Sequence, residues 1–155
     1  ARFILDEVAV KWRHKTVFAG NRPSDELMHA ASALKYVKVI PNPSVNQMSE
    51  LITNAQVCLL NASQPSGMKL KLINSLCSGR HVITSAPVVA GTRLESLCNI
   101  ASDPGDWISM TERLMQEDFT PEMRAKRDHV LREVADNILN ARKIIEFLNN
   151  YSPER

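Results

Sequence analysis

The chain has 155 residues, of which 44% are hydrophobic, 23% are charged and 5% are aromatic. This composition excludes a disordered or collagen-like protein and fits one globular domain with its own hydrophobic core. Nineteen basic and seventeen acidic residues give a formal net charge of +2 with His neutral. That balance argues against a protein that mainly binds the phosphate backbone of nucleic acid or an anionic membrane surface.

The sequence also contains signals that bear on the cellular location of the protein. No stretch holds the roughly 18 to 20 consecutive apolar residues that span a bilayer, and residues 1–7 lack the apolar run of a signal peptide. Cys58, Cys77 and Cys98 are odd in number, lie in apolar runs and lack metal-ligand spacing. We therefore expect a cytoplasmic protein without a transmembrane segment, whose cysteines serve as small hydrophobic residues.

The first elements in chain order are a helix over residues 2–12, a buried strand over 16–20 and a helix that Ser24 caps. The residues expected to face inward are Phe3, Ile4, Val8 and Trp12 in the first helix and Leu27, Met28, Ala31 and Leu34 in the second. No strand precedes the first helix, although a doubly wound sheet usually begins with a strand.

Two further strand and helix pairs follow. A strand over 37–40 precedes a helix that opens with a capping box formed by Ser44 and Gln47. A continuous apolar strand over 57–60 precedes a helix that ends at Gly79. The apolar residues expected to form the buried face of this helix are Leu72, Ile73, Leu76 and Cys77.

The second half of the chain begins with a strand over 81–85, which a short apolar run over 97–101 follows. Asp103 then starts a helix that runs to about residue 116, and Thr120 caps a long helix over about 121–150. The apolar stripe of the long helix consists of Met123, Val130, Val134, Ile138, Ala141, Ile145 and Leu148.

Continuous apolar strands that alternate with helices are typical of a parallel sheet covered on both faces. We therefore predict one α/β domain over residues 1–155, with three layers and a Rossmann-like parallel sheet. In such sheets, ligands bind outside the carboxyl ends of the strands. Four loops are expected there: Gly20 to Ser24, Pro41 to Ser44, Ser63 to Met68 and Ala86 to Thr92.

The third of these loops is the most informative. Ser66 and Gly67 lead into a helix, whose free N–H groups and positive dipole end favour an anion, and Gly67 allows close approach. Lys69 and Lys71 are expected in the first turn, where a cation is disfavoured unless an anion is bound. The pattern favours a bound diphosphate; the alternative is two ordinary surface lysines at a helix start.

Other chemistries find less support in the sequence. The four histidines have no partner at ligand spacing, so we expect no metal site: His14, His29, His81 and His129. The chain has no G-x-G-x-x-G motif, Walker motif or nucleophile elbow, which disfavours dinucleotide binding, P-loop ATP binding and a hydrolase triad. Four methionines lie at helical core or core-edge positions and are interpreted as packing residues: Met28, Met48, Met68 and Met123.

Residues 67–83 read G-M-K-L-K-L-I-N-S-L-C-S-G-R-H-V-I. This stretch resembles the signature of the group 1 (family 4) glycosyltransferases, which are retaining enzymes of the GT-B fold. Their pattern reads G-x-x-x-K-x-x-E-A-x-x-x-G-x-x-V-V, and Gly67, Lys71 and Gly79 match its glycines and lysine. The order of the surrounding elements also resembles the family, over about residues 3 to 150.

The resemblance implies that the chain is the C-terminal, donor-binding domain, and that a separate N-terminal domain binds the acceptor. It implies that Gly67 and Met68 offer backbone near the donor diphosphate or sugar, and that Lys71 acts on the diphosphate. Asn74 stands where the family has a glutamate that holds the ribose. The remaining implied contacts are Gly20, Asn21, Pro41 and Asn42 beside the base, and Gly91 and Thr92 over the diphosphate.

The function implied by the resemblance is transfer of a sugar from a UDP-, GDP- or other nucleoside-diphosphate sugar to an unknown acceptor, without a metal. Cell-envelope polysaccharide synthesis and peripheral membrane contact of the full-length enzyme are part of this expectation. The family's first strand, with its phosphate-binding Arg and Lys, would precede Arg2. Because the acceptor domain and part of the phosphate site are then absent, we expect the isolated chain not to turn over. Two alternatives stay open: a non-catalytic Rossmann-like binding module, and a sugar-nucleotide epimerase of the same fold.

Overall fold

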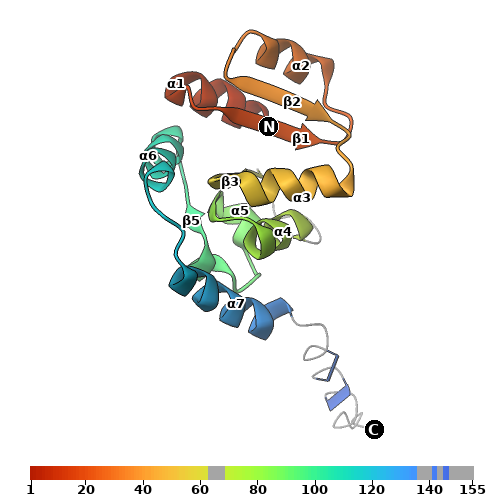
Figure 1. The fold of residues 1–155 in the computed structure, drawn as a ribbon, viewed down its shortest axis with the longest axis vertical. Helices are drawn as coiled ribbons and strands as arrows, with labels where there is room; N and C mark the ends of the chain where they lie inside the picture. Colours follow the sequence, from red (N-terminus) through yellow and green to blue (C-terminus); the bar gives the residue numbers. More distant parts are fainter. Residues whose placement is uncertain (63–68, 136–140, 143–144, 147–155) are drawn as a thin grey trace, which may run out of the picture.

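The computed structural model describes residues 1–62, 69–135, 141–142 and 145–146 of the chain. Its strands form two small sheets, both parallel (Figure 1). The first pairs β1 (Thr16–Gly20) with β2 (Val37–Pro41), and the second has the order β3 (Val57–Leu60), β4 (His81–Thr84) and β5 (Asn99–Ile100). The α/β class is therefore confirmed, but the single three-layer sheet is not, because β1 and β3 are not hydrogen-bonded to each other.

Helices connect these strands at nearly all the predicted places. The helical elements are η1 (Ile4–Ala9, a π-helix), α1 (Val10–Trp12), α2 (Asp25–Ser32), α3 (Val45–Asn54), α4 (Leu70–Ser78), α5 (Ala86–Val89), η2 (Glu95–Leu97, a 3₁₀ helix), α6 (Pro104–Met115) and α7 (Pro121–Ala135). The predicted helix over 2–12 is confirmed as the continuous pair η1 and α1, and its residues Ile4, Val8 and Trp12 are buried.

The helix starts follow the local capping chemistry that the sequence contains. The four predicted cap side chains each accept a hydrogen bond from a backbone N–H of the first turn: Ser24 from Leu27, Ser44 from Gln47, Asp103 from Asp106 and Thr120 from Met123. The capping box is complete, because the Gln47 side chain also accepts from the Ser44 N–H at 2.9 Å. Such caps satisfy N–H groups that have no partner inside the helix.

The core lies on both sides of the three-stranded sheet, and alternate strand residues supply the two sides. Val57, Leu59 and Ile83 pack with η1, α1, α2 and α6. Cys58, Leu60 and Val82 pack with α4 and α7. Packing against helices on both faces explains why β3 is a continuous apolar run rather than an alternating one.

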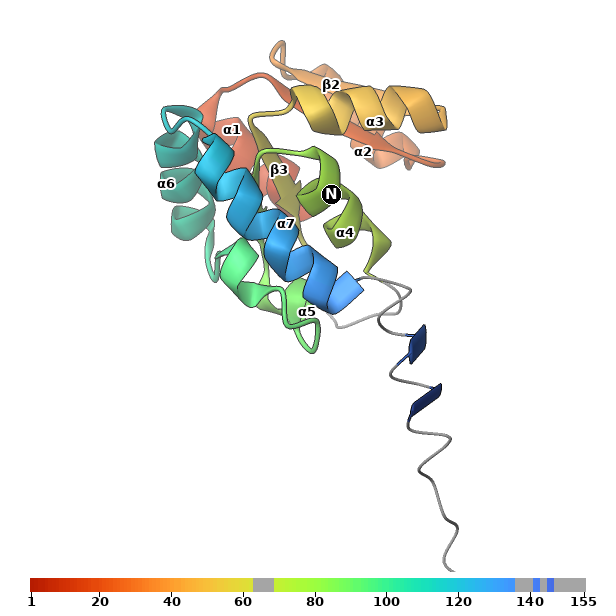
Figure 2. The same cartoon turned by 60° about the horizontal axis from the view of Figure 1, so that its bottom comes forward.

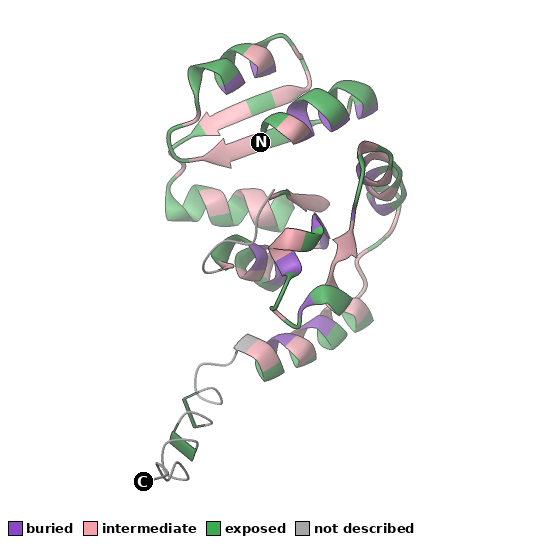
Figure 3. Cartoon of the chain, turned by 180° about the vertical axis from the view of Figure 1, so that it is seen from behind, coloured by how far each residue is buried: buried purple, intermediate pink, exposed green. Residues whose placement is uncertain are grey.

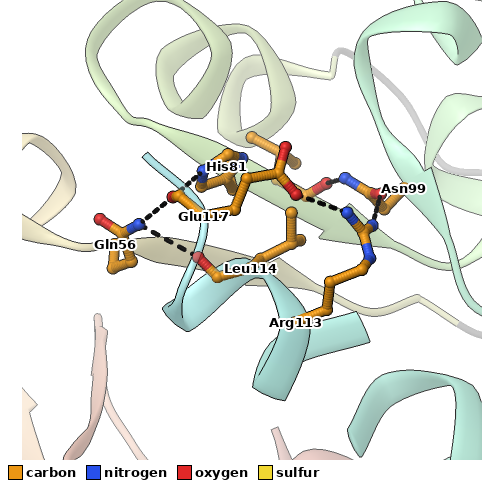
Figure 4. A network of polar contacts seen from close by, with 7 residues as sticks. Gln56, His81, Asn99, Arg113, Leu114 and Glu117 are labelled. Carbon is orange, nitrogen blue, oxygen red and sulfur yellow. Dashed lines mark hydrogen bonds and ion pairs between the residues drawn. The ribbon is translucent and has the colours of Figure 1, made fainter. Parts of the chain in front are cut away.

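The amino ends of β3 and β4 are closed by the end of α6 (Figure 4). Gln56 Nε2 donates to the carbonyl oxygens of Leu114, at 3.1 Å, and Glu117, at 2.8 Å. His81 Nε2 lies 2.9 Å from the same Glu117 carbonyl oxygen. Because a carbonyl oxygen only accepts, His81 carries a hydrogen on Nε2.

The same closure extends to β5 through Arg113. Its guanidinium donates to Asn99 Oδ1 at 2.8 Å and to the Glu117 carboxylate at 2.6 Å (Figure 4). The residues that make these contacts lie at the amino ends of their strands: Gln56 directly before β3, His81 in β4 and Asn99 in β5. The second sheet is thus covered at its amino edge by polar contacts to α6, and its loops gather at the opposite edge.

Helix α7 is tied to α4 by a buried arginine. Arg127 is only 5% exposed, and its guanidinium donates to the carbonyl oxygens of Leu76, Gly79 and Arg80. These carbonyls lie at the end of α4, where the negative end of the helix dipole favours a cation. The guanidinium carbon also lies 4.2 Å from the centre of the Phe119 ring, and α7 runs beside α4 (Figure 2).

Several predicted core residues face outward instead. Met28 is 38% exposed and Cys77 is exposed, because each lies next in sequence to a buried leucine and so about 100° further round its helix. Ile145 is 56% exposed. The predicted stripe residues Ile138 and Leu148 lie outside the described residues, as does much of the predicted helix beyond Ala135.

Gly79 ends α4 as predicted, but the reason is space rather than backbone conformation. Its φ of −84° is open to any residue, whereas an added Cβ would lie 2.6 Å from the Ser75 carbonyl oxygen and 3.1 Å from Cys58 Sγ. We expect Gly79→Ala to lower the free energy of unfolding by about 1 to 3 kcal/mol. The matched control is Gly20→Ala, where an added Cβ meets nothing within 4 Å. Equal urea midpoints for the two variants would contradict the steric explanation.

Arg127 provides a second stability test. Arg127→Ala removes the donors for three carbonyl oxygens at the end of α4, so we expect a loss of about 2 to 4 kcal/mol in urea unfolding. Arg132→Ala on the exposed face of the same helix is the control, with an expected change within about 0.5 kcal/mol. A small effect at both positions would show that the guanidinium does not hold α7 in place.

Candidate functional site

The carboxyl ends of β3 and β4 are joined by Ser85. Its N–H donates to the Leu60 carbonyl oxygen at 3.1 Å. Its hydroxyl donates to the Ala62 carbonyl oxygen at 3.0 Å and accepts from the Ala62 N–H at 3.1 Å. The chain that leaves β3 is therefore fixed up to Ala62, at the entrance to the loop predicted to bind an anion.

The position of Lys69 differs from the prediction. It is the cap residue of α4 rather than part of its first turn, and its Nζ donates to the Pro87 carbonyl oxygen of α5 at 3.2 Å. The loops that follow neighbouring parallel strands lie side by side, which is why this lysine reaches a carbonyl on the next loop. Its ammonium thus joins the start of α4 to α5 through one of its three N–H donors.

Lys71 lies in the first turn of α4 and is exposed. Its charge lowers the pKa of the Ala1 amino group, an effect second to burial of that group, so the lysine lies near the amino end of the first helix. Asn74 is exposed three residues further on. Residues three apart are neighbours on a helix surface, so Lys71 and Asn74 share one exposed face of α4.

The three residues expected just ahead of this helix, Ser66, Gly67 and Met68, lie outside the described residues. Their contact with a diphosphate stays a prediction.

Gly91 and Thr92 form a turn after α5. Gly91 is exposed and has a φ of +73°, a conformation that favours glycine. The Thr92 hydroxyl donates to the Val89 carbonyl oxygen at 2.7 Å and accepts from the Leu94 N–H at 3.1 Å. Its hydrogen is therefore used inside the loop, which leaves Thr92 as an acceptor only.

The residues predicted beside the base meet at the carboxyl end of the first sheet. The Asn42 N–H donates to the Gly20 carbonyl oxygen at 2.9 Å, and Asn42 Oδ1 accepts from the Arg22 N–H at 2.9 Å. Asn42 itself has a φ of +48°, which asparagine tolerates better than most residues. Its side-chain oxygen thus holds the turn that contains the exposed Asn21.

The predicted residues therefore form two groups. Lys71 and Asn74 lie on α4, whose cap residue Lys69 contacts Pro87 of α5, the helix that precedes Gly91. Gly20, Asn21 and Asn42 lie at the end of the other sheet. Two surface depressions, of about 300 and 220 Å³, lie elsewhere, along α3 and between α2 and β2, and no predicted site residue lines either.

Sequence reasoning did not assign a role to Ser85. The signal was a polar residue at the carboxyl end of the strand predicted over 81–85. In the structure the strand ends at Thr84, and the Ser85 side chain joins the two loops.

The arrangement favours electrostatic binding over nucleophilic chemistry. Within the described ranges, no group of three His, Cys, Asp or Glu side chains could hold a metal ion. Burial raises the pKa of the Cys98 thiol to about 11, despite the positive charge of Arg127, so this thiol stays protonated at neutral pH. An exposed cation on a helix start can stabilise an anionic ligand without forming a covalent bond.

Comparisons with family models, with curated proteins and with solved structures found no match to this chain. None of the helices in the described part is both long and apolar enough to cross a membrane.

Amide hydrogen exchange in the loop after β3 tests the contact between Ser85 and Ala62. We expect Ser85→Ala to remove both hydroxyl bonds to Ala62, which increases amide hydrogen exchange at Ala62 and lowers unfolding free energy by about 1 to 2 kcal/mol. Ser96→Ala, at an exposed position, serves as the control. Unchanged exchange at Ala62 in the Ser85 variant would show that the hydroxyl does not fix this loop.

Proposed function

We propose that the chain is the donor-binding half of a glycosyltransferase and binds a nucleoside-diphosphate sugar at the carboxyl edge of its second sheet. The observation that carries the proposal is the motif over residues 67–83, whose lysine, Lys71, is exposed in the first turn of the helix after β3. That position suits a residue that binds a diphosphate, because the helix dipole adds to the attraction of the ammonium.

In this proposal the protein contributes mainly electrostatics. Lys71 and the amino end of α4 stabilise the negative charge that develops on the departing diphosphate. The Asn74 side chain, on the same helix face, donates to or accepts from a ribose hydroxyl, more weakly than the charged glutamate of the family would. The acceptor binds to a separate domain, so the chain alone holds the donor without transferring its sugar.

A non-catalytic binding module is the second candidate. Asn74 in place of the family glutamate favours it, as does the segment Ser63 to Ser66, which has no carboxylate. The contact of Lys69 with Pro87 adds to this, because it uses one of the three N–H donors that the ammonium could offer to a ligand.

Calorimetric titration with UDP, GDP and their sugars tests the proposal. We expect binding by the wild-type chain and a loss of about tenfold in affinity, roughly 1.4 kcal/mol, in Lys71→Ala. Lys126→Ala, an exposed lysine on α7, should bind as the wild type does. If no nucleotide binds, even to a longer chain that includes a strand ahead of Ala1, the transferase proposal fails.

A product assay with the longer, two-domain protein separates the remaining alternative. Release of free nucleoside diphosphate in the presence of an acceptor supports a transferase. Conversion of the donor into an epimer without an acceptor supports a sugar-nucleotide epimerase instead.

A further inference from the structure

The near-neutral net charge of the chain conceals an uneven distribution of charges along the sequence. Every charged residue between Glu7 and Asp25 is basic, and so is every charged residue between Glu26 and Glu50. These two acid-free segments contain both strands of the first sheet. Their basic residues are Lys11, Arg13, Lys15, Arg22, Lys35 and Lys38. The balanced net charge therefore does not describe this part of the surface.

Two of these lysines lie side by side where the chain enters the first sheet. The Thr16 N–H donates to the Tyr36 carbonyl oxygen at 2.9 Å, which joins the chain ahead of β1 to the chain ahead of β2. Lys15 directly precedes Thr16, Lys35 directly precedes Tyr36, and both lysines are exposed. Thr16 is the one buried residue of β1 and β2, whose other positions are exposed or half-buried (Figure 3).

The end of the first helix brings two more cations to the same edge. The Tyr36 hydroxyl donates to the Val10 carbonyl oxygen at 3.4 Å, so the last turn of that helix lies beside the start of β2. Lys11 directly follows Val10, and Arg13 is the residue at which α1 ends. Both side chains are exposed. The four residues form what we call the amino-edge basic patch: Lys11, Arg13, Lys15 and Lys35.

The chain itself offers this patch little negative charge. Glu7 lies 3.5 Å from Lys11 Nζ, in a pair whose two side chains are about half exposed. Solvent-exposed pairs of this kind are weak. Among the described residues, no carboxylate forms an ion pair with Arg13, Lys15 or Lys35. The cations of the patch therefore repel one another without a counter-charge between them.

Helix dipoles explain only part of this arrangement. The negative end of a helix favours a cation in its last turn, which accounts for the two cations at the end of α1. α1 ends at Trp12 and α2 at Ser32, whereas Lys15 and Lys35 each lie three residues further on. Because the effect of the dipole falls off within the last turn, it does not account for these two lysines.

Arg13 has a backbone conformation that is unusual for an arginine. Its φ of +57° lies in the left-handed region, where the residue after a helix is usually glycine or asparagine. The substitution Arg13→Gly relieves this backbone strain and removes the cation at the same time. It therefore separates the charge of the patch from the stability of the fold.

The side chains around the patch favour phosphate groups that carry no base. A base in contact with the patch would need an aromatic face on which to stack. Trp12 is only 8% exposed, and Tyr36 is half-buried with its hydroxyl bonded to Val10. Ammonium groups bind phosphate as point charges, and a guanidinium donates to two phosphate oxygens at once. Several linked phosphates also concentrate negative charge in a small volume, as four neighbouring cations require.

We propose that the amino-edge basic patch binds an oligophosphate, a ligand of several linked phosphate groups. The patch lies at the amino edge of the first sheet, whereas the loops of the proposed donor site follow the carboxyl ends of the strands. It is therefore a second anion site, and it does not depend on the proposed glycosyltransferase activity.

Calorimetric titration of the full chain with inorganic tripolyphosphate tests this inference. We expect the wild-type chain to bind, and Lys15→Ala, Lys35→Ala and Arg13→Gly each to weaken binding by about threefold to tenfold. The urea midpoint of Arg13→Gly stays at or above that of the wild type, so its weaker binding does not come from unfolding. Lys126→Ala, at an exposed position on α7, is the matched control and keeps the wild-type affinity.

The dependence on salt provides a second readout. Raising the sodium chloride concentration from about 50 mM to about 200 mM weakens wild-type binding by about tenfold or more, because the contacts are electrostatic.

The inference is overturned if the wild-type chain does not bind tripolyphosphate. It is also overturned if Lys126→Ala loses as much affinity as the patch variants, because the ligand then responds to net charge alone. Binding that Lys71→Ala weakens and the patch variants leave unchanged would place the ligand at the proposed donor site instead. None of these results depends on whether a nucleotide binds.

A parallel titration with phosphatidylglycerol vesicles distinguishes free phosphates from lipid head groups. We expect the patch variants to lose affinity for tripolyphosphate, and the wild-type chain not to bind the vesicles. Binding to vesicles by a chain that does not bind tripolyphosphate would assign the patch to a membrane surface and overturn the proposed ligand.

Discussion

The placement of α4 depends on one buried charge. Removing the Arg127 guanidinium from water is unfavourable, and burial lowers its pKa accordingly. Three carbonyl oxygens, the negative end of the α4 dipole and the face of Phe119 compensate for the lost hydration. Because these acceptors lie at the end of α4 and the start of β4, one side chain fixes α7, α4 and β4 together. The direction of α4 in turn determines where Lys71 is presented.

Local signals in the sequence were sufficient for most elements. Apolar runs predicted the strands, and Ser24, Ser44, Asp103 and Thr120 marked the helix starts because capping needs only residues within one turn. The division into two sheets could not be predicted in this way, since strand pairing joins distant residues. Likewise, the contacts of Gln56 and His81 with Glu117 use a backbone carbonyl, which has no signature in the sequence.

In the candidate site, too, contacts between distant residues could not be predicted from the sequence. The sequence located the loops at the carboxyl ends of the strands, because that position follows from the order of strands and helices. It did not indicate that Lys69 donates to Pro87 or that Asn42 holds the turn at Arg22. Whether a polar side chain is available to a ligand depends on the nearest competing acceptor or donor, and these partners come from other loops.

In three contacts around the second sheet, the donor and the acceptor depend on the sequence to different degrees. Gln56, His81 and Arg127 donate through side chains, whereas the carbonyl oxygens that they reach at Leu76, Arg80, Leu114 and Glu117 belong to the main chain. Every amino acid supplies a carbonyl, so these contacts themselves restrict only the three donor positions, while other interactions restrict the acceptor residues, such as the burial of Leu76 and Leu114. A substitution at Gln56, His81 or Arg127 therefore removes a contact outright, whereas a substitution at an acceptor position leaves its carbonyl oxygen in place.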